Sequence, residues 1–172
     1  MVQTALAVTA HLETDLHRSA GLTPFEFHLL AVLGCQGPDL PMSAAAHYVD
    51  SSLSRLSHVV RRLEERGWVT RRTSPEDARV SLVTVTPVGM ERLENARGPY
   101  RRITREVFLD AFTAEELEQY TRLTLRLLAG LREGHWLLNE ERWPQEAREE
   151  VAVDGSVGDS SGGPGGASES DD

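Results

Sequence analysis

Arginine side chains are concentrated between residues 51 and 79. This segment holds seven arginines and four acidic residues, a local net charge of +3, in a chain whose overall net charge is −9. A guanidinium group stays protonated, carries five N–H donors, and pairs with phosphate oxygens or with O6 and N7 of guanine. The segment therefore has the chemistry of a surface for a nucleic acid, provided that the fold turns these side chains outward.

Residues 53–66 are expected to form a helix with one apolar and one polar face. Leu56, Val59, Val60 and Leu63 recur at helical spacing and predict the buried face. On the opposite face, short hydroxyl side chains let a helix approach base edges, and arginines can pair with guanine. The predicted DNA contacts of this segment are Ser51, Ser54, Arg55, Ser57, His58, Arg61 and Arg62. An ordinary solvated face would show the same pattern, so this helix alone does not decide the function.

A β-hairpin is expected directly after this helix, over residues 68–86. Two stretches rich in Val, Thr and Leu flank a turn at residues 74–78. Asp77 precedes Arg79 by two residues near the tip, and its carboxylate is predicted to aim the guanidinium at a narrow minor groove. The alternative is a surface ion pair of little energetic value. The remaining predicted contacts, to phosphates, are Arg71 and Arg72.

Capping signals place the other elements. Thr23-Pro24-Phe25-Glu26, Thr86-Pro87 and Thr113–Glu116 are helix starts, and the first and third form capping boxes. Ser43 is expected to cap a short helix over residues 44–49, and Gly98-Pro99 to kink a helix from residue 87 to about 111. The predicted order is four helices, two strands and two helices. This is a mainly α fold with a small β-hairpin: a winged helix-turn-helix core flanked by N- and C-terminal dimerisation helices.

The stretch from Met42 to Gly89 resembles the DNA-binding core of the multiple-antibiotic-resistance regulator (MarR) family. The family's usual pattern has a Leu-Glu-x-x-Gly helix end before two hydrophobic residues, an Asp-x-Arg wing, and a Thr-x-x-Gly start to the next helix. All three occur here in order. The residues that carry the resemblance are Ser54-Arg55, Leu63–Val69, Asp77-Ala78-Arg79 and Thr86-Pro87-Val88-Gly89. The predicted element order over residues 3–133 also matches that of the family.

The resemblance implies a sequence-specific regulator of transcription, a ligand-responsive repressor that binds palindromic operators in double-stranded DNA as a homodimer. It implies one domain over residues 1–133, with a DNA-binding core at 23–89 and dimerisation helices at 3–20 and 87–133. Apolar stripes on these helices support pairing independently, because a second subunit would bury them. Two alternatives stay open: a winged-helix module that binds proteins without direct DNA binding, which the overall acidity favours, and a MarR-like activator.

Residues after 133 have a different composition from the rest. Ten acidic residues and two arginines lie between residues 134 and 172, so the acidity of the chain is concentrated there. Residues 134–153 are expected to form a short extension, and residues 154–172, rich in Gly, Ser and Asp, a disordered acidic tail. The sequence shows no membrane span and no export signal, and its single cysteine suits a reducing compartment. A cytoplasmic location is therefore expected.

Residues that could sense a signal are few. His11, His17 and His28 are hypothesised to line a cleft for a small anionic effector, which members of the family often bind. No histidine pair at i, i+4 accompanies the lone cysteine, so neither a metal nor another cofactor is expected. Cys35 closes an apolar helix and is expected to be buried and inert. Phosphate-binding loops and nucleophile motifs are absent from the sequence, so the chain is not predicted to be an enzyme.

Overall fold

The structure is a computed structural model that describes residues 2–133 and 135–138. The chain forms two compact units, residues 1–124 and residues 125–172. Most of the predicted extension and all of the predicted acidic tail lie outside the described residues. Within the described part, no helix is both long enough and apolar enough to cross a membrane.

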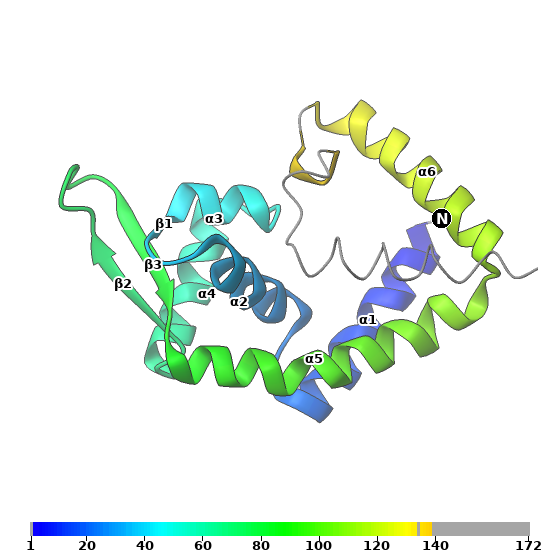
Figure 1. The fold of residues 1–172 in the computed structure, drawn as a ribbon, viewed down its shortest axis with the longest axis horizontal. Helices are drawn as coiled ribbons and strands as arrows, with labels where there is room; N and C mark the ends of the chain where they lie inside the picture. Colours follow the sequence, from blue (N-terminus) through cyan, green and yellow to red (C-terminus); the bar gives the residue numbers. More distant parts are fainter. Residues whose placement is uncertain (1, 134, 139–172) are drawn as a thin grey trace, which may run out of the picture. The chain divides into compact units, whose positions relative to one another are not determined.

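The elements follow the predicted order with one addition, a short first strand (Figure 1). The helices are α1 (Val2–Ala20), α2 (Pro24–Gln36), α3 (Met42–Tyr48), α4 (Leu53–Glu65), α5 (Pro87–Val107) and α6 (Ala114–Leu131). The strands are β1 (Leu40–Pro41), β2 (Val69–Thr73) and β3 (Ser81–Val85), and single 3-10 turns occupy Leu109–Ala111 and Trp136–Leu138. The predicted fold class, mainly helical with a small β-hairpin, is confirmed.

The three strands form one antiparallel sheet in the order β1-β3-β2. β3 pairs with β2 from Val69 opposite Val85 to Thr73 opposite Ser81, which gives the predicted hairpin. On its other edge β3 pairs with β1, Leu40 opposite Val83. Figure 1 shows the hairpin projecting beyond α3 and α4. The sheet thus joins the segment before α3 to the base of the wing.

Helix starts agree with the sequence at three of four predicted positions. The Thr23 side chain accepts from the Glu26 N–H at 3.2 Å, and the Glu26 carboxylate accepts from the Thr23 N–H at 3.0 Å. Thr113 and Glu116 form the same reciprocal pair, and the Thr86 side chain accepts from the Gly89 N–H. The prediction for Ser43 is wrong, because α3 begins at Met42 after Pro41 and has no side-chain cap. Strand β1 runs directly into α3, so the helix starts before Ser43 instead of after it.

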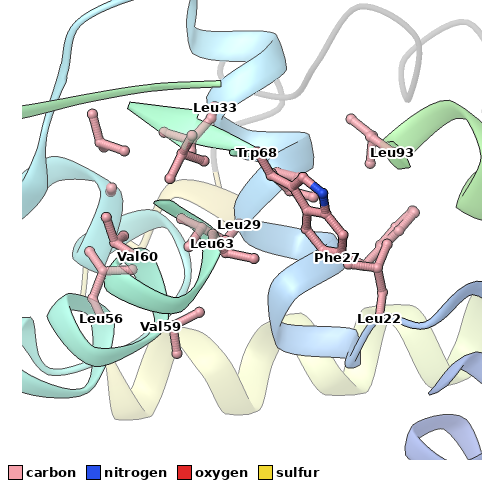
Figure 2. Packing of buried hydrophobic residues seen from close by; sticks show 14 of the residues in the cluster. Leu22, Phe27, Leu29, Leu33, Leu56, Val59, Val60, Leu63, Trp68 and Leu93 are labelled. Carbon is pink, nitrogen blue, oxygen red and sulfur yellow. The ribbon is translucent and has the colours of Figure 1, made fainter. Parts of the chain in front are cut away.

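The buried core of the first unit is shared by residues of α1 to α5 and of the sheet, and the inner face of α4 is part of it. The four predicted apolar residues of α4 are buried, with Leu56, Val60 and Leu63 fully inaccessible. Figure 2 shows these residues in one cluster with buried residues of other elements, including Leu29 and Leu33 of α2, which are also fully buried. Full burial of a leucine stabilises the fold by about 1.5–3 kcal/mol, so the burial of Leu56 and Leu63 fixes which face of α4 is turned inward. The opposite face of α4 is thereby turned to solvent.

Cys35 is exposed, so the prediction that it is buried is wrong. α2 buries Leu29, Leu30 and Leu33. Two residues beyond Leu33, the helix has turned by roughly 200°, which carries Cys35 to the opposite side. The apolar residues before Cys35 therefore do not imply that Cys35, in the last turn of α2, is buried.

The end of α4 is bonded to the start of α5. Gly67 follows α4 with a φ of +73°, in the left-handed region that favours glycine. The Thr86 hydroxyl donates to the Gly67 carbonyl at 2.7 Å, and the Thr86 N–H donates to the Trp68 carbonyl at 2.9 Å. A Cβ on Gly89 would overlap that same Trp68 carbonyl oxygen. The two glycine motifs of the sequence therefore meet at one junction, and glycine at position 89 allows the close approach.

Candidate nucleic-acid interface

The outward face of α4 carries the side chains that the sequence predicted there. Ser54, Arg55, His58, Arg61 and Arg62 are exposed, whereas Ser51 and Ser57 are half-buried. Ser52 caps the start of the helix, because its side chain accepts from the Arg55 N–H at 3.2 Å. Its first turn contains no acidic residue, so the positive end of the helix dipole is not offset locally. This end of α4 favours a phosphate group.

A cleft of about 620 Å³ lies along this face of α4. Five of the predicted contact residues line it, together with residues of α1, of α2 and of the turn before α2. The lining residues are Glu13, Thr23, Phe25, Ser52, Ser54, Arg55, His58, Val59, Arg61 and Arg62. The guanidinium of Arg55 lies 4.7 Å from the centroid of the Phe25 ring, a cation–π contact that restricts its orientation. The sequence indicated Phe25 only as part of the helix start Thr23–Glu26.

A second cleft of about 200 Å³ lies between the start of α4 and the hairpin. It brings Ser57 of the helix together with Arg71 and Arg79 of the hairpin, which are 14 and 22 residues further along the chain. The other lining residues are Met42, Ser43, Leu53, Val80 and Ser81. Leu53 was not predicted as a contact residue. The sequence could not indicate this position, because the cleft forms only when the hairpin folds against the helix.

Three of the predicted contact arginines form ion pairs within the chain. Arg62 lies 3.8 Å from the buried Glu26 carboxylate, which Arg66 also approaches at 3.5 Å. Arg71 lies 3.6 Å from Glu64. Sequence periodicity could not reveal these pairs, because each joins residues on different elements.

The third pair ties Arg72 to Asp39 in the turn before β1. The guanidinium donates two hydrogen bonds to the carboxylate, at 2.8 and 2.6 Å. These hydrogen bonds and the positive charge of Arg72 hold the pKa of Asp39 below its ordinary value. The Thr84 hydroxyl accepts from the Asp39 N–H at 2.9 Å. Arg72 is therefore engaged in holding strand β2 to the body of the unit.

Two predicted contact arginines differ from the rest. Among the described residues, the guanidinium groups of Arg61 and Arg79 have neither a carboxylate nor an aromatic ring as a partner. Both side chains are exposed, Arg61 on the outward face of α4 and Arg79 near the tip of the hairpin. Each therefore presents its full charge and its N–H donors to solvent.

Asp77 does not hold the Arg79 side chain as the sequence suggested. Its carboxylate accepts a hydrogen bond from the backbone N–H of Arg79 at 2.9 Å, and its carbonyl accepts from the Val80 N–H at 2.9 Å. An aspartate that bonds to the backbone two residues ahead stabilises a tight turn. Asp77 thus shapes the tip from which Arg79 extends.

The three histidines proposed as effector contacts have different surroundings. Nε2 of His11 lies 3.6 Å from the Asp15 carboxylate on the same helix. His17 is exposed in the last turn of α1. Nε2 of His28 lies 3.0 Å from the Tyr100 hydroxyl, which joins α2 to α5. None of the three lines either cleft above. In the described part of the chain, no three His, Cys, Asp or Glu side chains are grouped to hold a metal ion.

Comparison with known proteins decides the family. The MarR family model matches residues 22–81, from the residue pair before α2 to the first residue of β3. A MarR family transcriptional regulator from Streptomyces coelicolor, solved in complex with DNA, is 30% identical in sequence. The alignment covers 79% of this chain and 91% of that one, with a TM-score of 0.72. The chain belongs to the MarR family. Because members of the MarR family are regulators of transcription, the prediction that the chain is not an enzyme is confirmed.

Two curated relatives extend this comparison. The HTH-type transcriptional regulator YdgJ of Bacillus subtilis is 30% identical over 112 residues, which are 65% of this chain and 65% of that protein. The HTH-type transcriptional repressor IacR of Pseudomonas putida is 31% identical over 101 residues, 59% of this chain and 58% of that protein. The chain therefore spans less than two thirds of the length of each of these two relatives.

Proposed function

We propose that this MarR family member is a DNA-binding repressor that acts in the cytoplasm as a homodimer on a palindromic operator. In this proposal α4 enters the major groove and the β2–β3 hairpin lies along the adjacent minor groove. The observation that carries it is the pair of partnerless, exposed guanidinium groups of Arg61 and Arg79, among the described residues, on two projecting elements. The DNA-bound Streptomyces regulator, 30% identical, supports the same partner.

The electrostatics of the two clefts favour DNA over a protein partner. Both are lined by arginine and serine side chains, and only Glu13 contributes a carboxylate. Phosphate oxygens supply the acceptors that the guanidinium groups of Arg61 and Arg79 lack among the described residues, and binding to phosphates releases counterions. Ser54, His58 and Arg61 on α4 are the proposed base contacts. Arg55, stacked on Phe25, is a proposed phosphate contact whose orientation is preset.

The apolar face of α6 supports the homodimer. Tyr120, Leu123, Leu127 and Leu131 recur every three or four residues, and each is at least 45% exposed in the single chain. None of the described side chains of α6 is buried. A stripe of this kind is stable in water only when another surface covers it, and a second copy of α6 presents a matching stripe. A two-fold dimer presents two copies of α4, and dimers that use a recognition helix bind half-sites about one helical turn apart.

Repression and ligand response are the finer parts of the proposal. The relative IacR is named a repressor, and it supports the same sign of regulation here. The proposed effector contacts are His11, His17 and His28. Of these His28 is the strongest, because its contact with Tyr100 joins α2 to α5. α5 is bonded to the end of α4 through Thr86, so a ligand that shifts α5 against α2 would also shift α4.

The experiment selects bound sequences from randomised duplex DNA with the full chain, then measures affinity for the selected operator. We expect one palindromic sequence, and a loss of about 5- to 150-fold per subunit for Arg61→Ala or Arg79→Ala. Arg102→Ala is the matched control, because it removes an arginine that already pairs with Glu106 at 2.9 Å. Near-unchanged affinity in both test variants would refute the mechanism.

A further inference from the structure

Leu53 is an exposed apolar side chain at the start of the helix proposed to read DNA. It is the first residue of α4 and is 52% exposed. The other exposed residues of this helix are polar or charged: Ser54, Arg55, His58, Arg61, Arg62 and Glu65. A single exposed leucine is common on protein surfaces, so its surroundings must decide what it contacts.

The surroundings of Leu53 favour DNA as its partner. Leu53 lines the cleft of about 200 Å³ that Ser57, Arg71 and Arg79 also line. An apolar protein surface seated on Leu53 would bury the Arg79 guanidinium, which has no carboxylate partner among the described residues, and such a burial is costly. DNA offers phosphates for the arginines together with an apolar group for the leucine. Charge complementarity therefore selects DNA.

The apolar group that the major groove presents is the C5-methyl of thymine. The N-terminal residues of a recognition helix contact base edges in that groove, and Leu53 occupies this end of α4. We propose that Leu53 is a specificity-determining residue that contacts a thymine C5-methyl group at one position of each operator half-site. This inference rests on the proposed function, and it adds the identity of one base.

The expected effect follows from the burial of one methyl group. Replacing that thymine by deoxyuridine removes the methyl and leaves base pairing unchanged. Burial of one such group corresponds to about a fourfold change in affinity, so replacement in both half-sites of a palindrome lowers affinity by about 16-fold. Because Leu53→Ala removes the side chain that buries the methyl, this variant should bind the thymine and uracil operators equally well.

The experiment uses the full chain and its selected operator, with each symmetric pair of thymines replaced in turn by deoxyuridine. We expect one pair to be sensitive for the natural chain and insensitive for Leu53→Ala. Val88→Ala is the control: Val88 is also exposed, at 53%, but lies at the start of α5, and this variant should keep the thymine dependence. Thermal unfolding of each variant shows whether the fold is kept, and Leu53→Ser provides a second truncation.

Two results would overturn the inference alone: a palindrome whose binding is insensitive to deoxyuridine at every position, or a thymine dependence that persists in both Leu53 variants. A chain that selects no duplex sequence would overturn the proposed function and this inference with it. The two failures are therefore distinguishable in a single set of measurements.

Discussion

Arg72 of strand β2 forms a bidentate pair with Asp39 in the turn before β1, with two hydrogen bonds of 2.8 and 2.6 Å. Asp39 has a φ of +63°, a left-handed conformation that is uncommon for a residue other than glycine. Thr84 of β3 bonds to the same residue. Both strands of the hairpin are therefore held by Asp39, and the arginine predicted to reach a phosphate holds the hairpin in place instead.

We expect Arg72→Ala and Asp39→Asn to weaken operator binding by similar factors, both smaller than that of Arg79→Ala. Both variants loosen the hold of Asp39 on the hairpin without removing a DNA contact, and the double variant should be no weaker than either single one. Affinity measured across salt concentrations provides the check. If Arg72→Ala lowered the salt slope by about 1 per subunit and Asp39→Asn did not, Arg72 would be a phosphate ligand.

The link between Asp39 and Arg72 should depend on pH. Because the pKa of Asp39 is lowered in the folded chain, its ionised form stabilises the fold above the ordinary aspartate pKa. This stabilisation is lost as the pH falls through the folded-state value. The hairpin of the natural chain should be better protected from amide hydrogen exchange than that of Asp39→Asn at neutral pH. The difference should shrink below about pH 4, and a constant difference down to acid pH would contradict the link.

Glu26 should stabilise the fold by two separable means. Its side chain is buried, caps α2 through the Thr23 N–H, and faces Arg62 and Arg66 of α4. Glu26→Ala removes both contributions and should lower the free energy of unfolding by about 1–3 kcal/mol. Glu26→Gln can still accept from the Thr23 N–H, so it should cost less.

The same pair of variants has a signature in DNA binding. Glu26→Gln releases Arg62, so affinity for random duplex DNA should rise and its salt dependence should steepen. Urea unfolding and titration with non-operator DNA measure the two effects. Equal stability of the two variants would show that the cap contributes nothing, and unchanged non-operator affinity would show that Glu26 does not restrain Arg62.

Gly89→Ala should disrupt the junction between α4 and α5. The added Cβ would overlap the Trp68 carbonyl oxygen, which is backbone and cannot move aside cheaply. We expect a loss of at least about 1–3 kcal/mol in the free energy of unfolding, and weaker operator binding as well. Val88→Ala, one residue earlier on an exposed position, should change stability by less than about 0.5 kcal/mol. Similar unfolding curves for the two variants would rule out the close approach.

Charges placed on the apolar face of α6 should separate the dimer. Leu123→Glu and Leu127→Glu each put a carboxylate on the exposed stripe, where a partner copy would have to desolvate it. Light scattering after gel filtration should give the mass of a dimer for the natural chain and of a monomer for these variants. Val88→Glu, on an exposed site of α5, should remain dimeric. A natural chain that is monomeric at every concentration would refute the dimer.

The local elements of this protein could be predicted from the sequence because their signals lie within a few residues. The Thr23–Glu26 and Thr113–Glu116 capping boxes are reciprocal contacts over three residues, so the residue types alone determine them. The same holds for the apolar stripe of α4, which its spacing predicts. Strand β1 could not be predicted in this way, because two residues with a proline carry no strand pattern, and β3 supplies their hydrogen-bond partners.

The sequence by itself determined which residues face outward on α4 and the hairpin, since helical and strand periods are properties of the chain. Only the tertiary structure decided which of those arginines are paired with a carboxylate of the same chain and which are left available to a binding partner. Glu26, Asp39 and Glu64 neutralise Arg62, Arg72 and Arg71 from other elements, whereas no described carboxylate reaches Arg61 or Arg79. An ion pair depends on distance in space, and distances between elements exist only after the chain has folded.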